Sequence, residues 1–243
     1  MTGEPQLAGQ TVVVIGGSSG VGLETARRTR GEGANVIITA RDPDGVVRAG
    51  LEVGASIAAF DATDFDRLDS FFDALLTPID HVLVTVPGSC DVPLAAFDVE
   101  EARRDLDARL LLPLQVARNA VSKIRPGGTL LFMGGTGGRR TAPGLAFVSA
   151  LTAAMPALTK NLALELAPIR VNLIAVGFVD SPLSGALLDD RLDARREQLR
   201  RSLPIRRVVG PVDIAALAVH LMTNTAVTGA TFDIDGGQQL IDG

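Results

Sequence analysis

Short apolar runs recur along the chain, and amphipathic stretches of helical period separate them. Continuous apolar runs are typical of parallel strands that are buried on both faces. Alternating strands and helices predict an α/β fold of the Rossmann type, a doubly wound parallel sheet of about seven strands with helices on both faces. The predicted strands are Thr11–Ile15, Val36–Thr39, Ser56–Phe60, His81–Val86, Thr129–Met133, Val171–Val176 and Ala230–Ile234.

Five stretches carry apolar residues at helical spacing. They are Gly20–Gly31, Phe65–Leu76, Val99–Ile124, Val148–Ala167 and Val212–Met222. Residues 181–204, rich in Leu, Asp and Arg, interrupt the alternation, and we expect them to form a helical insertion that acts as a substrate lid. A chain of 243 residues can bury a sizeable core, so we expect residues 1–243 to form a single domain.

Composition and charge narrow the function classes. The chain has a net charge of −5 with scattered arginines, which argues against nucleic acid as a partner. It contains two histidines and one cysteine, too few for a zinc site of the ordinary Cys/His type, and no metal is expected. There is no tyrosine and no tryptophan. Any mechanism that needs a phenolic acid is therefore excluded.

The start of the chain, Met1-Thr2-Gly3-Glu4-Pro5-Gln6, lacks the basic and apolar regions of a signal peptide. No uninterrupted apolar run approaches the roughly 20 residues of a membrane helix. A single cysteine, Cys90, cannot form an internal disulfide. We expect a cytoplasmic protein that does not bind membranes.

A glycine-rich turn joins the first predicted strand to the first helix, with Gly16, Gly20 and Gly22 as its key positions. Gly16 allows the tight turn, Gly20 lets the backbone approach a pyrophosphate, and Gly22 lets helix and strand pack closely. The helix N-terminus supplies free amides to the phosphates. The pattern predicts a dinucleotide-binding domain.

Cofactor choice is read at the end of the second strand, where an acid would hold the ribose of NAD and an arginine the 2′-phosphate of NADP. Ala40 stands where the acid is expected, and Arg41 follows it. This favours NADP(H), with NAD(H) the weaker choice. In the alternative, Arg41 is a solvated edge charge and Asp42 holds the ribose of NAD.

The chain resembles the short-chain dehydrogenase/reductase family over nearly its whole length. The family's G-x-x-x-G-x-G pattern matches Gly16, Gly20 and Gly22, and its R-V-N and D-G-G segments match residues 170–172 and 235–237. The resemblance implies that Asp61 pairs with the adenine and that Ser181 offers a hydroxyl to a cofactor phosphate. The implied cofactor-binding residues are Gly16, Ser18, Ser19, Gly20, Val21, Gly22, Arg41, Asp61, Ala62, Gly88, Thr152, Gly177, Val179 and Ser181.

The catalytic half of the resemblance is missing, so the chain is an atypical relative without the Asn-Ser-Tyr-Lys set. The family's tyrosine and lysine positions fall on Val148 and Thr152, its serine on Gly135 and its asparagine on Arg109. Neither Val148 nor Thr152 can move a proton at neutral pH. A general acid contributes typically about 10²–10⁴ in rate, so this loss needs an explanation.

The candidates for replacing the lost set include an arginine, a threonine and a cysteine. Arg109 could stabilise developing negative charge or clamp a carboxylate, or it could simply pair with Asp105 or Asp107. Thr152 could bond the nicotinamide ribose or be an ordinary helix hydroxyl. Cys90 could serve as a thiol, although such a cysteine is more often a small buried hydrophobe.

The first hypothesis is an NADP(H)-dependent oxidoreductase of this family with a non-standard active site and a small carbonyl or alcohol substrate. The alternative is a catalytically inactive NADP(H)-binding subunit or sensor. A non-redox lyase or isomerase using the same cleft is a third. The resemblance also implies a homodimer or homotetramer built on the helices Val99–Ile124 and Val148–Ala167.

Overall fold

Seven strands form one sheet in the order β3-β2-β1-β4-β5-β6-β7, and all neighbouring pairs are parallel. The computed structural model describes residues 6–76, 78–85, 92–139 and 143–241. Every residue of β1 and β4 is buried, as expected for strands covered on both faces. The predicted α/β sheet is confirmed. Its strands are β1 (Thr11–Ile15), β2 (Asn35–Ala40), β3 (Ser56–Ala59), β4 (Ile79–Val84), β5 (Ile124–Gly135), β6 (Arg170–Val176) and β7 (Thr231–Ile234).

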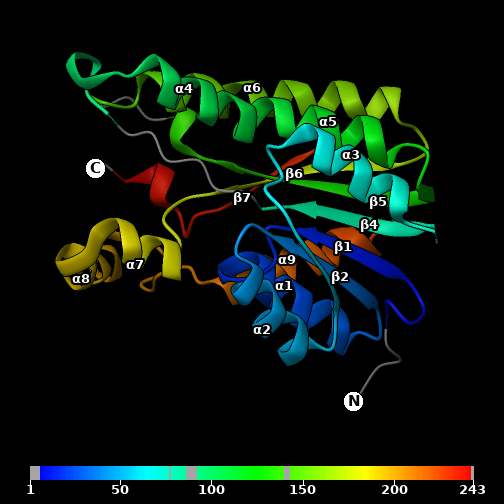
Figure 1. Cartoon of the computed structure of the whole chain (residues 1–243). Helices are drawn as coiled ribbons and strands as arrows, with labels where there is room; N and C mark the ends of the chain where they lie inside the picture. The colour runs from blue at the N-terminus through cyan, green and yellow to red at the C-terminus, as the bar shows by residue number, and fades with distance from the viewer. Residues whose placement is uncertain (1–5, 77, 86–91, 140–142, 242–243) are drawn as a thin grey trace.

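Helices cover both faces of the sheet, and each face has its own apolar core (Figure 1). One layer holds α1 (Gly20–Gly31), α2 (Pro43–Val53) and α9 (Pro211–Thr223). The other holds α3 (Phe65–Ala74), α4 (Val99–Leu106), α5 (Leu112–Ala120) and α6 (Ala146–Glu165). Among the described helices, only α6 has the length and hydropathy to cross a membrane. Its Met155 and Leu162 are buried in the core with β5 and β6 residues, the position of a core helix.

The predicted continuous helix Val99–Ile124 is wrong. A π-helical segment, residues 107–111, separates α4 from α5, and Ile124 already belongs to β5. Pro113 has no N–H to donate to the Arg109 carbonyl four residues earlier. In the π segment, bonds span five residues, as from the Leu112 N–H to the Asp107 carbonyl, which accommodates the missing donor. Arg109 therefore lies in a widened turn.

The sequence pattern missed α2, which contains two glycines in its interior, Gly45 and Gly50. Its ends are nevertheless well marked. The Asp42 carboxylate accepts hydrogen bonds from the N–H groups of Asp44 and Gly45, and Gly54 ends the helix with a φ of 69°. Because the Asp42 carboxylate caps α2, its oxygens are already engaged at the carboxyl end of β2.

Residues 181–204, the predicted insertion, contain two helices, α7 (Pro182–Leu188) and α8 (Leu192–Ser202). They stand apart from the two helix layers, at the left of Figure 1. An isolated parallel bridge joins Val179 to Val209, so the segment leaves and rejoins the fold at one point.

Candidate active site

The glycine-rich turn after β1 has the backbone geometry that its sequence requires. Gly16 has a φ of 87° and Gly20 a φ of 52°, in the left-handed region that favours glycine. A Cβ on Gly22 would lie 2.3 Å from the Gly16 carbonyl oxygen. The Thr85 hydroxyl donates to the carbonyls of Ile15 and Gly16, at 3.0 and 2.9 Å. The start of α1 is thus packed directly against a turn that β4 holds in place.

A cavity of about 470 Å³ begins at this turn and continues between β5, the π segment and α6. It lies at the carboxyl ends of the strands, where ligands of open parallel sheets bind. Nine of the sequence-predicted cofactor residues line it: Gly16, Ser19, Gly20, Val21, Gly22, Thr152, Gly177, Val179 and Ser181. Ser18, Arg41, Asp61 and Ala62 do not line it, and Gly88 lies outside the described residues, as does Cys90.

Arg41 and Asp61 lie together at the carboxyl ends of β2 and β3. The Arg41 Nη1 is 4.0 Å from the Asp61 Oδ2, and the Arg41 side chain is 74% exposed. Asp61 accepts hydrogen bonds from the Thr63 N–H and hydroxyl, at 2.9 and 2.7 Å. Asp42, the alternative ribose ligand, instead caps α2 and lies 3.7 Å from the Arg48 Nη2. The exposed cation at this end is therefore better placed than the Asp42 carboxylate to meet a ligand.

The four residues that the sequence alignment predicts at the family's catalytic positions meet in the cavity wall. Arg109, Gly135, Val148 and Thr152 all line it. The Thr152 hydroxyl donates to the Val148 carbonyl at 2.9 Å, as an ordinary helix hydroxyl does. A Cβ on Gly135 would lie 3.3 Å from the Thr152 Cγ2. Gly135 thus packs closely against the Thr152 methyl group, and the methyl groups of Thr152 and Val148 belong to the cavity wall.

Arg109 is the one ionisable residue among the described residues that line the cavity. Its side chain is 23% exposed, and its Nε lies 3.6 Å from the Oδ2 of Asp105, whose side chain is 8% exposed. The structure therefore combines both expectations for this residue, since Arg109 faces the cavity and also pairs with Asp105. At 3.6 Å the pair is an ion pair rather than a hydrogen bond.

The apolar wall of the cavity was not predicted from the sequence. Pro113, Phe132, Leu151 and Met155 line it, and the latter three are largely or fully buried. A signal was present on α6, because residues 148, 151, 152 and 155 share one helix face. Phe132 and Pro113 come from other elements and could not be assigned to the cavity from local patterns.

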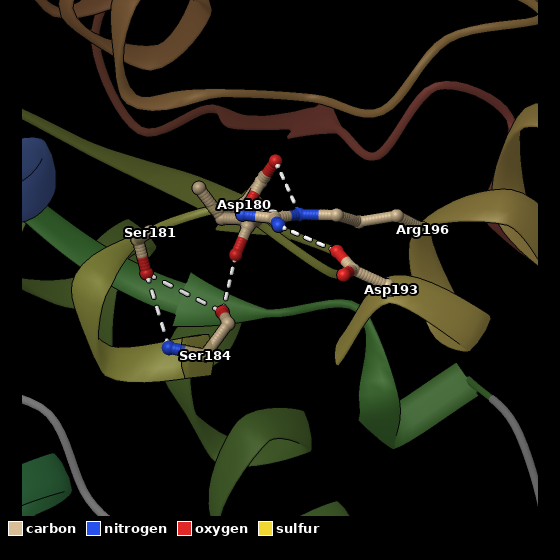
Figure 2. Close-up of polar contacts among 6 residues, drawn as sticks. Asp180, Ser181, Ser184, Asp193 and Arg196 are labelled. Atoms are coloured by element: carbon tan, nitrogen blue, oxygen red, sulfur yellow. Dashed lines mark hydrogen bonds and ion pairs between the residues drawn. The ribbon is translucent and has the colours of Figure 1, made fainter. Parts of the chain in front are cut away.

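The insertion of residues 181–204 is connected to the rest of the fold by an ion pair (Figure 2). Arg196 of α8 donates from Nε and Nη2 to the Asp180 carboxylate, at 2.7 to 3.1 Å, and from Nη1 to Asp193 at 2.9 Å. Ser181 and Ser184 line the cavity, and the Ser181 hydroxyl accepts from the Ser184 N–H at 3.4 Å. One arginine thereby connects α8 to the residue that precedes the cavity-lining Ser181.

Comparisons with known proteins agree with this architecture. A family model described as enoyl-(acyl carrier protein) reductase matches residues 15–239. The 3beta-hydroxysteroid dehydrogenase 1 of Eggerthella lenta is 33% identical over 253 residues, covering 98% of this chain and 96% of that protein.

Two solved structures have closely similar folds. MalC reductase/Diels-Alderase from Malbranchea aurantiaca superposes with a TM-score of 0.91 at 24% identity, covering 98% of this chain and 99% of that one. A small-chain dehydrogenase in complex with NADPH superposes with a TM-score of 0.83 at 26% identity, covering 96% and 100%. Because the family match spans nearly the whole chain, this protein belongs to the short-chain dehydrogenase/reductase family.

Proposed function

We propose that this chain is an NADP(H)-dependent oxidoreductase with a non-standard active site, acting on a small carbonyl or alcohol substrate. The observation that carries the proposal is one continuous cavity. It begins at the glycine turn that suits a pyrophosphate and ends at Arg109, Val148 and Thr152. A dinucleotide lying along it would have its nicotinamide beside the residues that replace the usual catalytic set.

The choice of NADP(H) rests on the end of β2. The Asp42 carboxylate receives the N–H groups of Asp44 and Gly45 at 3.2 and 3.0 Å, which commits it to capping α2. Arg41 is exposed and free to turn toward a 2′-phosphate, with only a 4.0 Å ion pair to Asp61. A structural neighbour of this family binds NADPH, which supports the same choice here.

When bound, the cofactor supplies the hydride. The chain's own contribution is positioning, exclusion of water and charge. One wall of the cavity is apolar, formed by the buried Val148, Leu151 and Met155, and Arg109 presents a guanidinium to any oxygen that becomes negative during the reaction. A preorganised donor in such a site stabilises the transition state without giving up a proton. Arg109 thus acts by charge alone.

The experiment is Arg109→Met, with Arg104→Met on the exposed side of α4 as the matched control. Loss of one preorganised donor should lower kcat by about 10²–10³, with NADPH affinity unchanged. The control variant should keep both. Full turnover by Arg109→Met would show that Arg109 has no part in the reaction.

A second candidate is a subunit that binds NADP(H) without turnover. It is favoured by the absence of any proton-transferring side chain among the described cavity residues. The double variant Val148→Tyr, Thr152→Lys restores the family's pair at a position that already lines the cavity. Carbonyl reduction that appears only after this change would favour the non-catalytic subunit over the oxidoreductase.

A further inference from the structure

Three acidic residues are buried among the residues that the structure describes, namely Asp80, Asp105 and Asp235. The carboxylates of Asp80 and Asp235 hold the backbone, since each accepts a hydrogen bond from a backbone N–H, at 2.7 and 2.8 Å. Asp105, near the end of α4, has a different kind of partner. Its Oδ2 lies 3.6 Å from the Nε of Arg109, a residue that lines the cavity. This carboxylate therefore bears on the site as well as on the fold.

Helix stability does not explain a pair of charges at this place. Burial removes a carboxylate and a guanidinium from water, and their attraction only roughly offsets that cost. The exposed pair of Glu101 with Arg104, on the same helix, avoids the cost because both side chains stay in water. The Asp105–Arg109 pair is then explained by what the carboxylate does to the guanidinium.

The carboxylate approaches the guanidinium along one edge. The Arg109 Nε is shielded from solvent, whereas the side chain as a whole is 23% exposed and lines the cavity. Its accessible surface therefore lies away from Nε. A guanidinium is planar and rigid, so a partner at Nε also fixes the direction of its terminal nitrogens. Without that partner, the long arginine side chain would sample several rotamers.

The carboxylate also changes the charge that a ligand meets. Opposite charges 3.6 Å apart largely cancel for a third charge that lies farther away than their separation. A permanently anionic ligand is attracted by Arg109 and repelled by Asp105. A neutral carbonyl compound has no net charge to be repelled, and its oxygen meets the nearest donors of the guanidinium. The pair therefore suits a neutral substrate better than an anionic one.

We propose that Asp105 is a positioning residue that directs the terminal nitrogens of Arg109 toward the cavity and, by offsetting their charge, favours neutral over anionic substrates. This inference rests on the proposed NADP(H)-dependent function of the same cavity. Asp105 is not one of the described residues that line the cavity, so it acts through Arg109 and not on the substrate itself.

The first experiment measures whether Asp105 acts through Arg109. Asp105→Asn removes the charge at nearly constant size, and Glu101→Gln makes the same change on the exposed face of α4. With NADPH and methyl benzoylformate, Asp105→Asn should lower kcat by about tenfold or more at unchanged NADPH affinity, and Glu101→Gln should change neither. In the Arg109→Met background, Asp105→Asn should cause no further loss, because the group that it positions is gone. Two losses that multiply would overturn the proposal.

The second experiment measures charge selectivity with two substrates that differ by one charge, methyl benzoylformate and benzoylformate. In Asp105→Asn, the ratio of their kcat/KM values should shift toward the anion by about tenfold. Asp105→Glu keeps the charge but moves the carboxylate by one methylene group. It should lose kcat and keep the wild-type ratio, and it replaces Asp105→Asn if that variant does not fold. Wild-type NADPH affinity identifies the folded variants. An unchanged ratio in Asp105→Asn, or a wild-type kcat in Asp105→Glu, would overturn the proposal.

The third experiment needs no turnover. In crystal structures with NADPH, the Arg109 guanidinium should face the cavity in the wild type and leave that position in Asp105→Asn. A guanidinium in the same place in both would overturn this inference and leave the proposed oxidoreductase standing. A wild type that binds NADPH but reduces neither substrate would count against the proposed function, and the two crystal structures would still decide whether Asp105 positions Arg109.

Discussion

A methyl group added at Gly22 tests whether the glycine turn and α1 are packed as closely as cofactor binding requires. The new Cβ would lie 2.3 Å from the Gly16 carbonyl oxygen, 2.8 Å from the Thr85 hydroxyl and 2.9 Å from the Gly17 Cα. A relaxed carbon–oxygen contact is about 3.3 Å, so the turn or the helix must move by about 1 Å. Two of the three contacts are backbone, which cannot rotate away.

The magnitude follows from two opposing effects in Gly22→Ala. Overpacking costs about 1–3 kcal/mol, and alanine gains about 1 kcal/mol over glycine inside a helix. We expect the free energy of unfolding to fall by up to about 2 kcal/mol. Displacement of the turn that faces the phosphates should weaken NADPH binding by about tenfold, because 1.4 kcal/mol corresponds to that factor.

The matched control is Gly31→Ala, at the other end of α1, where an added Cβ meets no atom within 4 Å. It should be neutral or stabilise the fold by up to about 1 kcal/mol, with NADPH affinity unchanged. Urea unfolding is followed by circular dichroism, since the chain has no tryptophan. A Gly22→Ala protein as stable and as tight for NADPH as Gly31→Ala would refute the close packing.

Four further outcomes are expected. Arg41→Ala should weaken NADPH by about tenfold or more and leave NADH unchanged in fluorescence titrations, because only NADPH has the 2′-phosphate that a charge-assisted hydrogen bond would hold. Burial lowers the pKa of His81 from 6.5 to about 4, so the unfolded chain takes up this proton first as pH falls. Stability should therefore drop by about 3 kcal/mol between pH 6.5 and 4, and chemical unfolding of His81→Gln should lose that part of the slope. Arg196→Met should speed proteolysis within residues 181–204, since Asp180 loses the guanidinium that connects α8 to the fold, whereas the exposed Arg200→Met should not. Light scattering should give at least twice the chain mass of 25.3 kDa, because apolar side chains on the outer faces of α5 and α6, such as Leu114 and Leu164, are 40% and 80% exposed.

The parts of the site that sequence predicted are those set by local backbone requirements. Gly16 and Gly20 need positive φ values, and such needs appear in the sequence as glycines at fixed spacing. The parts that were not predicted depend on packing between elements that are far apart in the sequence. Phe132 on β5 and Met155 on α6 line one wall only because the sheet and helix pack there. The Asp-Pro pair at residues 42–43 is a typical start of a helix and indicated the cap. The two glycines inside α2 weakened the helical pattern of the residues that follow, so the helix itself was not predicted.

The Arg109–Asp105 ion pair helps to decide between a catalytic protein and a subunit that only binds the dinucleotide. Burying two charges costs more than burying apolar side chains of similar volume, and replacing such a pair with apolar residues is often neutral or stabilising by about 1–4 kcal/mol. The neighbouring positions Gly135 and Val148 show that small or apolar residues fit this wall. A chain that only binds a dinucleotide gains nothing from keeping a guanidinium at the far end of the cavity, against a carboxylate that is 8% exposed. An enzyme that stabilises negative charge without a proton donor does gain from it, and for that reason the oxidoreductase stands ahead of the non-catalytic subunit.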